Sequence, residues 1–291
     1  MKALVFSGGG AKIHYHVGAA RVLLEAESEY ALFAGVSAGA LVAAYLAQFP
    51  SGVEEEAIHC LEGLTKPLRE SDLLSRWWPF GRTEGLWKSS FYDTSPLHRL
   101  VRRELSVDAI RTSGRKLRLG AVSLDGGDFL VLDEQSENLH DAVLASCAFP
   151  GVMTPVMIRG QPYVDGGVRV YTPIKAAIDA GATEIDIVLA SPREPSPVRL
   201  RKTSAVHIAA RAMELMIDEI IDKDLRQARL HNQLAMANPG YGKRLVTLRV
   251  IRPEHELPMG TWEFNSPKTA IVRAAGYRDA QLALAHASLV Q

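Results

Sequence analysis

The sequence predicts a layered α/β fold with a largely parallel central sheet. Short apolar runs bounded by turn residues recur along the chain, and stretches with helical spacing separate most of them. The first two strand-to-helix turns, at residues 7–10 and 35–39, are rich in glycine and serine. Strands that alternate with helices favour a parallel sheet covered by helices. We see no internal repeat and no second core behind a linker, so we expect residues 1–291 to form a single domain.

The predicted strands are the apolar runs that stop at turn residues. They cover residues 2–6, 31–36, 116–124, 128–132, 156–158, 163–164, 184–190 and 245–251. The runs 116–124 and 128–132 flank Asp125-Gly126-Gly127, which indicates a hairpin. Helical spacing predicts helices at residues 17–24, 38–48, 54–64, 94–105, 138–148, 173–180, 204–237 and 267–286.

Two regions depart from this alternation. Residues 65–92 have weak periodicity, two prolines and three of the four tryptophans. Their aromatic residues suit a packed subdomain, which we favour slightly. The alternative is a lid or cap whose rings lie at a membrane surface, with anionic headgroups bound by the interleaved Arg69, Arg76, Arg82 and Lys88. Residues 191–197 read as a proline-punctuated linker, and residues 198–291 as a C-terminal helical extension. The long helix of this extension has an apolar stripe that we expect to pack into the core rather than to form a groove for an acyl chain. The stripe consists of Met213, Leu215, Met216, Ile217, Ile220 and Ile221.

Charge and composition exclude several classes of protein. The chain has 33 Lys and Arg against 33 Asp and Glu, so it has no net positive charge with which to hold a nucleic acid. Its N-terminal apolar run is too short for a signal peptide, and no stretch reaches the length of a membrane span. The two cysteines, Cys60 and Cys147, lack C-x-x-C spacing. We therefore expect a cytoplasmic protein that binds no nucleic acid and whose membrane contact, if any, is peripheral.

Gly35-Val36-Ser37-Ala38-Gly39 matches the nucleophile elbow, a sharp turn between a strand and a helix. Its small residues let the chain turn tightly and expose the Ser37 hydroxyl. The N–H of Ala38 and the end of the following helix would favour an oxyanion beside that serine. The alternative is that glycine and serine merely form a strand-to-helix turn.

Gly8-Gly9-Gly10 follows the first predicted strand. Amides without side chains can approach a ligand closely and donate to negatively charged oxygen. The run lacks the spacing of a P-loop, and Ile13 stands where a dinucleotide fingerprint needs glycine. An oxyanion-binding loop is therefore one interpretation, and a plain turn is the other.

No histidine stands out as the partner of a catalytic serine. None of the nine lies in a distinctive glycine-flanked context, and only two predicted strands precede Ser37, whereas several precede the elbow of the usual α/β hydrolases. His14 and His16 could form a metal-binding pair but lack a clear third ligand, so we expect surface or packing roles for them. We assign no role to His98, His207 and His255, and we predict no metal and no cofactor.

Taken together, the motifs resemble those of the patatin-like phospholipases over residues 1–190. The resemblance rests on the order of Gly8-Gly9-Gly10-Ala11-Lys12, Gly35-Val36-Ser37-Ala38-Gly39, Ala145-Ser146-Cys147-Ala148-Phe149-Pro150-Gly151, Pro155 and Asp165-Gly166-Gly167. It implies a three-layer α/β/α fold around a central, largely parallel sheet. It also implies a dyad without catalytic histidine, with Ser37 as nucleophile and Asp165 as its base. The implied oxyanion hole consists of Gly8, Gly9 and Gly10, to which the elbow adds Ala38.

Three positions depart from the family's pattern. Ile13 stands where the family usually has glycine, and Ser7 where it often has aspartate. Tyr171-Thr172-Pro173 replaces a sequence that often resembles Asn-x-Pro. Asp125 begins a second Asp-Gly-Gly, but its place in a predicted hairpin favours Asp165 as the base.

These inferences predict a serine acyl hydrolase that cleaves fatty-acyl esters of phospholipids or related lipids through an acyl-enzyme. A partly desolvated Asp165 within reach of Ser37 would be a stronger base than an aspartate in water. Two alternatives stay open: a lipid acyltransferase with the same dyad, and a catalytically silent module that binds a membrane or a protein. The sequence predicts neither the headgroup, acyl position and chain length of the substrate nor the oligomeric state.

Overall fold

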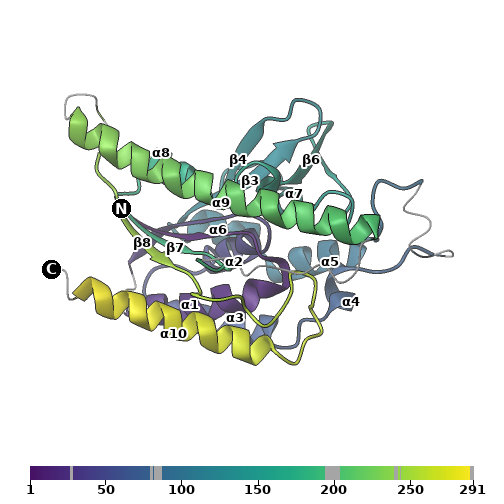
Figure 1. Ribbon diagram of the computed structural model, residues 1–291, viewed down its shortest axis with the longest axis horizontal. Helices are drawn as coiled ribbons and strands as arrows, with labels where there is room; N and C mark the ends of the chain where they lie inside the picture. The colour runs from purple at the N-terminus through teal and green to yellow at the C-terminus, as the bar shows by residue number, and fades with distance from the viewer. Residues whose placement is uncertain are drawn as a thin grey trace.

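The computed structural model of the chain describes residues 1–26, 29–78, 81, 87–193, 204–238, 242 and 244–288. Within these residues an eight-stranded sheet forms the centre of the molecule (Figure 1). Its strand order is β5-β6-β3-β2-β1-β7-β8, and β4 pairs with β3 beside this path. The strands are β1 (Lys2–Phe6), β2 (Tyr30–Gly35), β3 (Lys116–Ser123), β4 (Phe129–Asp133), β5 (Val156–Ile158), β6 (Gln161–Asp165), β7 (Glu184–Val188) and β8 (Thr247–Ile251).

The sheet is parallel over most of its width and antiparallel at one side. β8, β7, β1, β2 and β3 run parallel. β4 and β6 are antiparallel to β3, and β5 is antiparallel to β6. The predicted hairpin is confirmed, because β3 and β4 pair across the turn at Asp125-Gly126-Gly127. The C-terminal third supplies β8 and so belongs to the same sheet.

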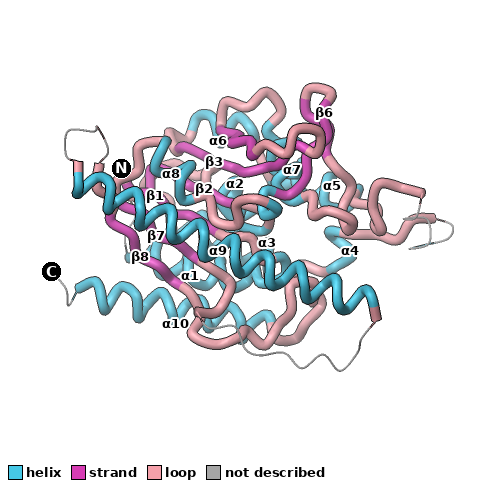
Figure 2. The backbone as a smooth tube through the Cα atoms, turned by 45° about the horizontal axis from the view of Figure 1, so that its top comes forward, coloured by secondary structure: helices cyan, strands magenta, loops and turns pink. Residues whose placement is uncertain are grey.

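Helices cover both faces of the sheet. They are α1 (Ile13–Ala26), α2 (Ala38–Leu46), α3 (Glu54–Thr65), α4 (Glu70–Leu73), α5 (Ser95–Glu104), α6 (Val107–Thr112), α7 (Leu139–Cys147), α8 (Ile174–Asp179), α9 (Ala205–Ala237) and α10 (Thr269–Ser288). Figure 2 shows α9 stretched across one side of the molecule, with α1 and α10 behind and below it. None of the described helices is both long and apolar enough to cross a membrane.

Alternate residues of the central strands pack into two separate cores. Leu4 and Phe6 of β1 pack with the face that carries α1, α2, α7 and α10. Ala3 and Val5 pack with the face that carries α8 and α9. Since successive side chains of a strand point to opposite faces, this alternation places the sheet between two helical layers. The three-layer α/β/α fold with a largely parallel sheet is therefore confirmed.

The observed elements differ from the prediction in a few places. α1 begins at Ile13 rather than at residue 17, and α6 was not predicted. α6 is short, and its start is marked only by Ser106, whose hydroxyl accepts the Ala109 N–H at 3.2 Å. The predicted core stripe of α9 is partly wrong. Ile221 is buried there, whereas the exposed members of the stripe are Met213, Leu215 and Met216.

In the described part of the segment 65–92, α4 is followed by little regular structure. A single antiparallel bridge joins Ser75 to Asp93, and the Trp77 indole N–H donates to the Ser90 carbonyl at 3.0 Å. Trp78 and Trp87 are 89% and 84% exposed, so the favoured interpretation as a packed subdomain is wrong for these two rings. Arg82, and residues 194–197 of the predicted linker, lie outside the described residues.

Candidate active site

Two glycine-rich turns meet at one edge of the sheet. β1 and β2 are parallel neighbours, and Phe6 lies opposite Gly35 at their carboxyl ends. The loop Gly8-Gly9-Gly10 follows β1, and Ser37 follows β2. Because parallel strands deliver their following loops to the same edge, the two motifs come together there.

Ser37 has a backbone conformation that non-glycine residues rarely adopt, with φ 58° and ψ −128°. Its two glycine neighbours make this turn possible. A Cβ at Gly35 would lie 2.1 Å from the Gly39 carbonyl oxygen, and a Cβ at Gly39 would lie 2.4 Å from the Ser7 carbonyl oxygen. The elbow motif therefore has a steric cause, and the strained serine is held by tight packing around it.

Asp165 ends β6, and the end of α7 connects it to Ser37. The Asp165 N–H donates to the Ala148 carbonyl at 2.9 Å, and the Ser37 N–H donates to the Ser146 carbonyl at 3.0 Å. Between these two bonds, the Cys147 thiol donates to the Ser37 carbonyl at 3.2 Å. The segment Ser146–Ala148 thus holds the serine turn and the aspartate in one rigid unit.

Asp165 is only 1% exposed, and one of its two carboxyl oxygens lacks a hydrogen bond of ordinary geometry among the described residues. Its Oδ1 accepts the Gly167 N–H at 2.7 Å, while no described group bonds Oδ2 with ordinary geometry. Burial raises the pKa of Asp165 to about 7, and the nearby Ser37 side chain and the Gly167 N–H counteract part of that rise. A carboxylate with this pKa can accept a proton near neutral pH.

The three glycines after β1 are not equivalent. The Gly8 N–H donates to the Tyr171 carbonyl at 3.0 Å and is therefore engaged. Within the described residues, no partner bonds the N–H groups of Gly9, Gly10 and Ala38. Gly10 has φ +54°, and a Cβ there would lie 2.4 Å from the Thr261 carbonyl oxygen. Three backbone donors thus remain available on the two loops that meet at this edge of the sheet, and Gly10 and Ala38 line one cavity with Ser37.

An apolar cavity of about 40 Å³ adjoins Ser37. Part of its wall is formed by Trp262 and Phe264, in the segment between β8 and α10. The Trp262 ring packs edge-on against the Phe149 ring, with 5.2 Å between the ring centroids. A second apolar cavity of about 40 Å³ shares several lining residues with the first, namely Ile13, Leu41, Leu68 and Leu73. Sequence analysis missed the two C-terminal aromatics because the segment around them carries no regular pattern.

A buried carboxylate of α9 fixes the chain that follows Asp165. Asp224 Oδ2 accepts the N–H groups of Tyr171 and Thr172 at 2.8 and 2.9 Å. Burial raises the pKa of Asp224, and these two bonds counteract the rise. The Tyr171 ring in turn packs against Gly8, where a Cβ would lie 2.7 Å from a ring carbon. Asp224 was also missed, since one acidic residue on a long helix gives no signal.

Among the described side chains, no histidine lines the cavity at Ser37 or bonds Asp165. His14 and His16 are both buried, and desolvation lowers their pKa values to about 4 and about 3. His16 Nε2 lies 3.3 Å from the Ser7 hydroxyl, and His14 pairs with Arg273, so both have packing roles. No described group of three or more metal-ligating side chains could hold an ion. The competing Asp125 is exposed in the β3–β4 turn.

The chain is similar in sequence and in fold to known proteins. The family model of the patatin-like phospholipases matches residues 4–178. A patatin-like phospholipase domain-containing protein of Emericella nidulans is 29% identical over 205 residues, or 60% of this chain and 26% of that protein. The chain thus spans about a quarter of the length of this relative.

YqhO of Bacillus subtilis, described as uncharacterized, is 27% identical over 74% of this chain and 79% of its own length. VipD from Legionella pneumophila matches in structure with a TM-score of 0.48 and 14% identity, over 98% of this chain and 67% of VipD.

Proposed function

The chain belongs to the patatin-like phospholipase family, and from that premise we propose that it is a serine acyl hydrolase that cleaves fatty-acyl esters of phospholipids or related lipids. Family membership supports lipid hydrolysis as the general activity. The finer proposal rests on one observation: a buried carboxyl with a free oxygen and a pKa of about 7 lies beside a strained serine. Ser37 is the nucleophile in this proposal, and Asp165 is its base.

The reaction then proceeds through an acyl-enzyme. Ser37 Oγ attacks the ester carbonyl carbon while Asp165 Oδ2 takes the hydroxyl proton. The N–H groups of Gly9, Gly10 and Ala38 donate to the tetrahedral oxyanion, and Gly8 is left out because its N–H is engaged. The intermediate collapses, the ester C–O bond breaks, and Asp165 returns the proton to the leaving alcohol. Asp165 then takes a proton from a water molecule whose oxygen attacks the acyl carbonyl carbon. The bond between Ser37 Oγ and the acyl group breaks, the fatty acid leaves, and Asp165 returns the proton to Ser37 Oγ.

The apolar cavities at Ser37 suit an acyl chain, but they are nearly closed. A volume of about 40 Å³ holds only a few water molecules. A fatty-acyl chain therefore enters only if side chains of the wall, such as Trp262, move aside. We also propose that the whole chain is one hydrolase domain, and that residues 65–92, with Trp78 and Trp87 exposed, form a cap that touches the lipid surface.

Release of fatty acid from mixed phospholipid vesicles tests the proposal. Wild type, Ser37→Ala and Asp165→Asn are compared side by side with a chelator present, and circular dichroism checks that each variant is folded. We expect release by the wild type alone. Equal release by all three proteins would contradict the dyad. Transfer of the acyl chain to an added alcohol in preference to water would identify an acyltransferase with the same dyad.

A further inference from the structure

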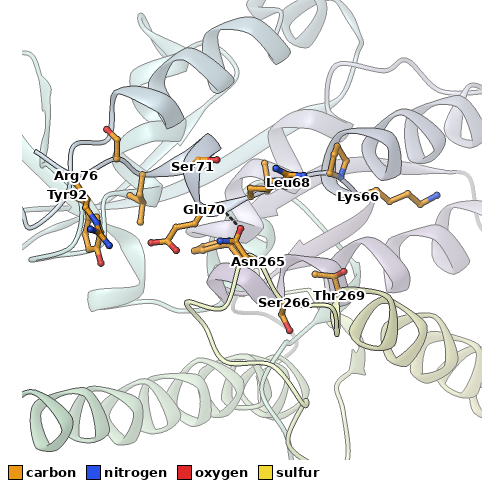
Figure 3. A pocket seen from close by; sticks show the side chains of 14 residues that line it. Lys66, Leu68, Glu70, Ser71, Arg76, Tyr92, Asn265, Ser266 and Thr269 are labelled. Carbon is orange, nitrogen blue, oxygen red and sulfur yellow. Dashed lines mark hydrogen bonds between the residues drawn. The ribbon is translucent and has the colours of Figure 1, made fainter. Parts of the chain in front are cut away.

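A polar groove adjoins the apolar cavity at Ser37. Its volume is about 760 Å³, and it lies between the chain that follows α3 and the chain that precedes α10 (Figure 3). Leu68 and Phe264 line both the groove and the cavity at Ser37, so the two spaces share a wall. The Asn265 side-chain oxygen accepts the Glu70 N–H at 3.1 Å and joins the two sides of the groove.

Cations and small polar groups dominate the lining of the groove. It has one carboxylate, Glu70, and three cations, Lys66, Arg69 and Arg76. Hydroxyl and amide groups complete it, from Ser71, Ser75, Asn265, Ser266 and Thr269. The chain as a whole has zero net charge, so this excess of positive charge is local.

The two arginines are available to a ligand. Both are exposed, and among the described residues neither forms an ion pair, whereas Lys66 lies 3.4 Å from Glu62. The Ser75–Asp93 bridge fixes the backbone directly before Arg76. Figure 3 shows Arg76 and Tyr92 at the same end of the groove.

We propose that this groove binds the phosphate of a glycerophospholipid headgroup while an acyl chain of the same molecule occupies the cavity at Ser37. The guanidinium group matches phosphate with paired donors, and the hydroxyls add further donors. An amphiphile with an anionic head fits a cationic groove and an apolar cavity that share one wall. This inference rests on the proposed function and assigns the headgroup of its substrate to a specific groove of the fold.

A pair of substrates that differ only by the phosphate provides the test. Hydrolysis of dioleoyl phosphatidic acid and of dioleoylglycerol is measured in the same neutral detergent micelles, as a ratio of kcat/KM values. For Arg69→Gln/Arg76→Gln we expect this ratio to fall roughly tenfold, as for the loss of two partly exposed charged hydrogen bonds. The matched control is Arg102→Gln/Arg103→Gln, which removes two exposed arginines from α5 outside the groove and leaves the ratio unchanged. An unchanged ratio in the groove variant overturns the inference and leaves the proposed function intact.

Binding separates the headgroup site from catalysis. In a Ser37→Ala background, the Kd for phosphatidic acid micelles is measured with and without the Arg69→Gln/Arg76→Gln pair, and we expect a roughly tenfold rise. This result would support the groove even if hydrolysis failed in every variant, a failure that would count against the proposed function alone. An equal Kd with and without the pair overturns the inference. So does equally strong binding of inorganic phosphate, because the groove would then recognise free phosphate rather than a lipid headgroup.

Discussion

Residues 1–193 and residues 204–288 build the candidate site in different ways. The first region supplies the proposed reacting groups from short motifs at strand ends, where Gly35 and Gly39 leave room for the Ser37 turn. The second region supplies walls and braces through contacts across the fold, such as Trp262 at the cavity and Asp224 behind Tyr171. The family model ends at residue 178, before the second region begins. The proposed reacting groups thus lie in short, recognisable motifs, whereas the walls and braces around them come from residues that carry no motif.

Asp165→Asn should give the largest effect on the first region. The Asn side chain keeps the Gly167 bond that Oδ1 accepts but cannot act as the base, so we expect kcat/KM to fall by roughly 10²–10⁴-fold. The same role predicts that wild-type kcat/KM falls about tenfold per pH unit below an apparent pKa of about 7. Initial rates of both proteins on a soluble ester between pH 5 and 9 measure the loss in the variant and the pH dependence of the wild type. A flat wild-type profile would contradict the role of Asp165.

The same substitution should stabilise the fold. Because the pKa of Asp165 is raised from 3.8 to about 7 on folding, its contribution to stability is present below pH 4 and is lost as the pH rises to 7. The uncharged amide of the variant carries no such cost, so above pH 7 we expect Asp165→Asn to raise the free energy of unfolding by up to about 4 kcal/mol. Urea unfolding of both proteins at pH 5 and pH 8 tests this, and a smaller gain at pH 8 than at pH 5 would be evidence against it.

Asp224→Ala tests the brace from the second region. Removing the carboxylate leaves the buried N–H groups of Tyr171 and Thr172 without partners, so we expect a loss of roughly 1–3 kcal/mol per unsatisfied group. The exposed Asp222 on the same helix provides the control, because Asp222→Ala should change stability by less than about 0.5 kcal/mol. Equal unfolding midpoints for the two variants would show that the bonds to Asp224 do not stabilise the fold.

Trp262→Ala should have the smallest effect, on chain-length preference. Shortening this side chain enlarges the cavity at Ser37, so we expect the ratio of kcat/KM for dodecanoyl over butanoyl p-nitrophenyl esters to rise roughly threefold to tenfold. Leu282→Ala removes an exposed apolar side chain of α10 that is not part of the cavity and serves as the control. The same ratio in both variants would argue that the wall does not select the acyl chain.

The sequence predicted the elements and motifs that depend on neighbouring residues. The strands of the sheet, the β3–β4 hairpin and the Ser37 turn follow from apolar runs, turn residues and glycine spacing. The engagement of the Gly8 N–H was not predictable, because its partner Tyr171 is distant in sequence. Nor was the exposure of Met216 on α9, since a helical stripe does not show which part of it another element covers. The polar groove was not predictable either, because its two sides are distant in sequence and meet only in the folded chain.

Covalent labelling tests the central claim, that Ser37 is the nucleophile activated by Asp165. The folded protein is treated with a fluorophosphonate, and the adduct is located by peptide mass spectrometry in wild type, Ser37→Ala and Asp165→Asn. The account predicts one adduct on Ser37 in the wild type, none at any other serine in Ser37→Ala, and slower labelling in Asp165→Asn. Labelling of Ser37→Ala at the wild-type rate, or an adduct on a different residue of the wild type, would contradict it.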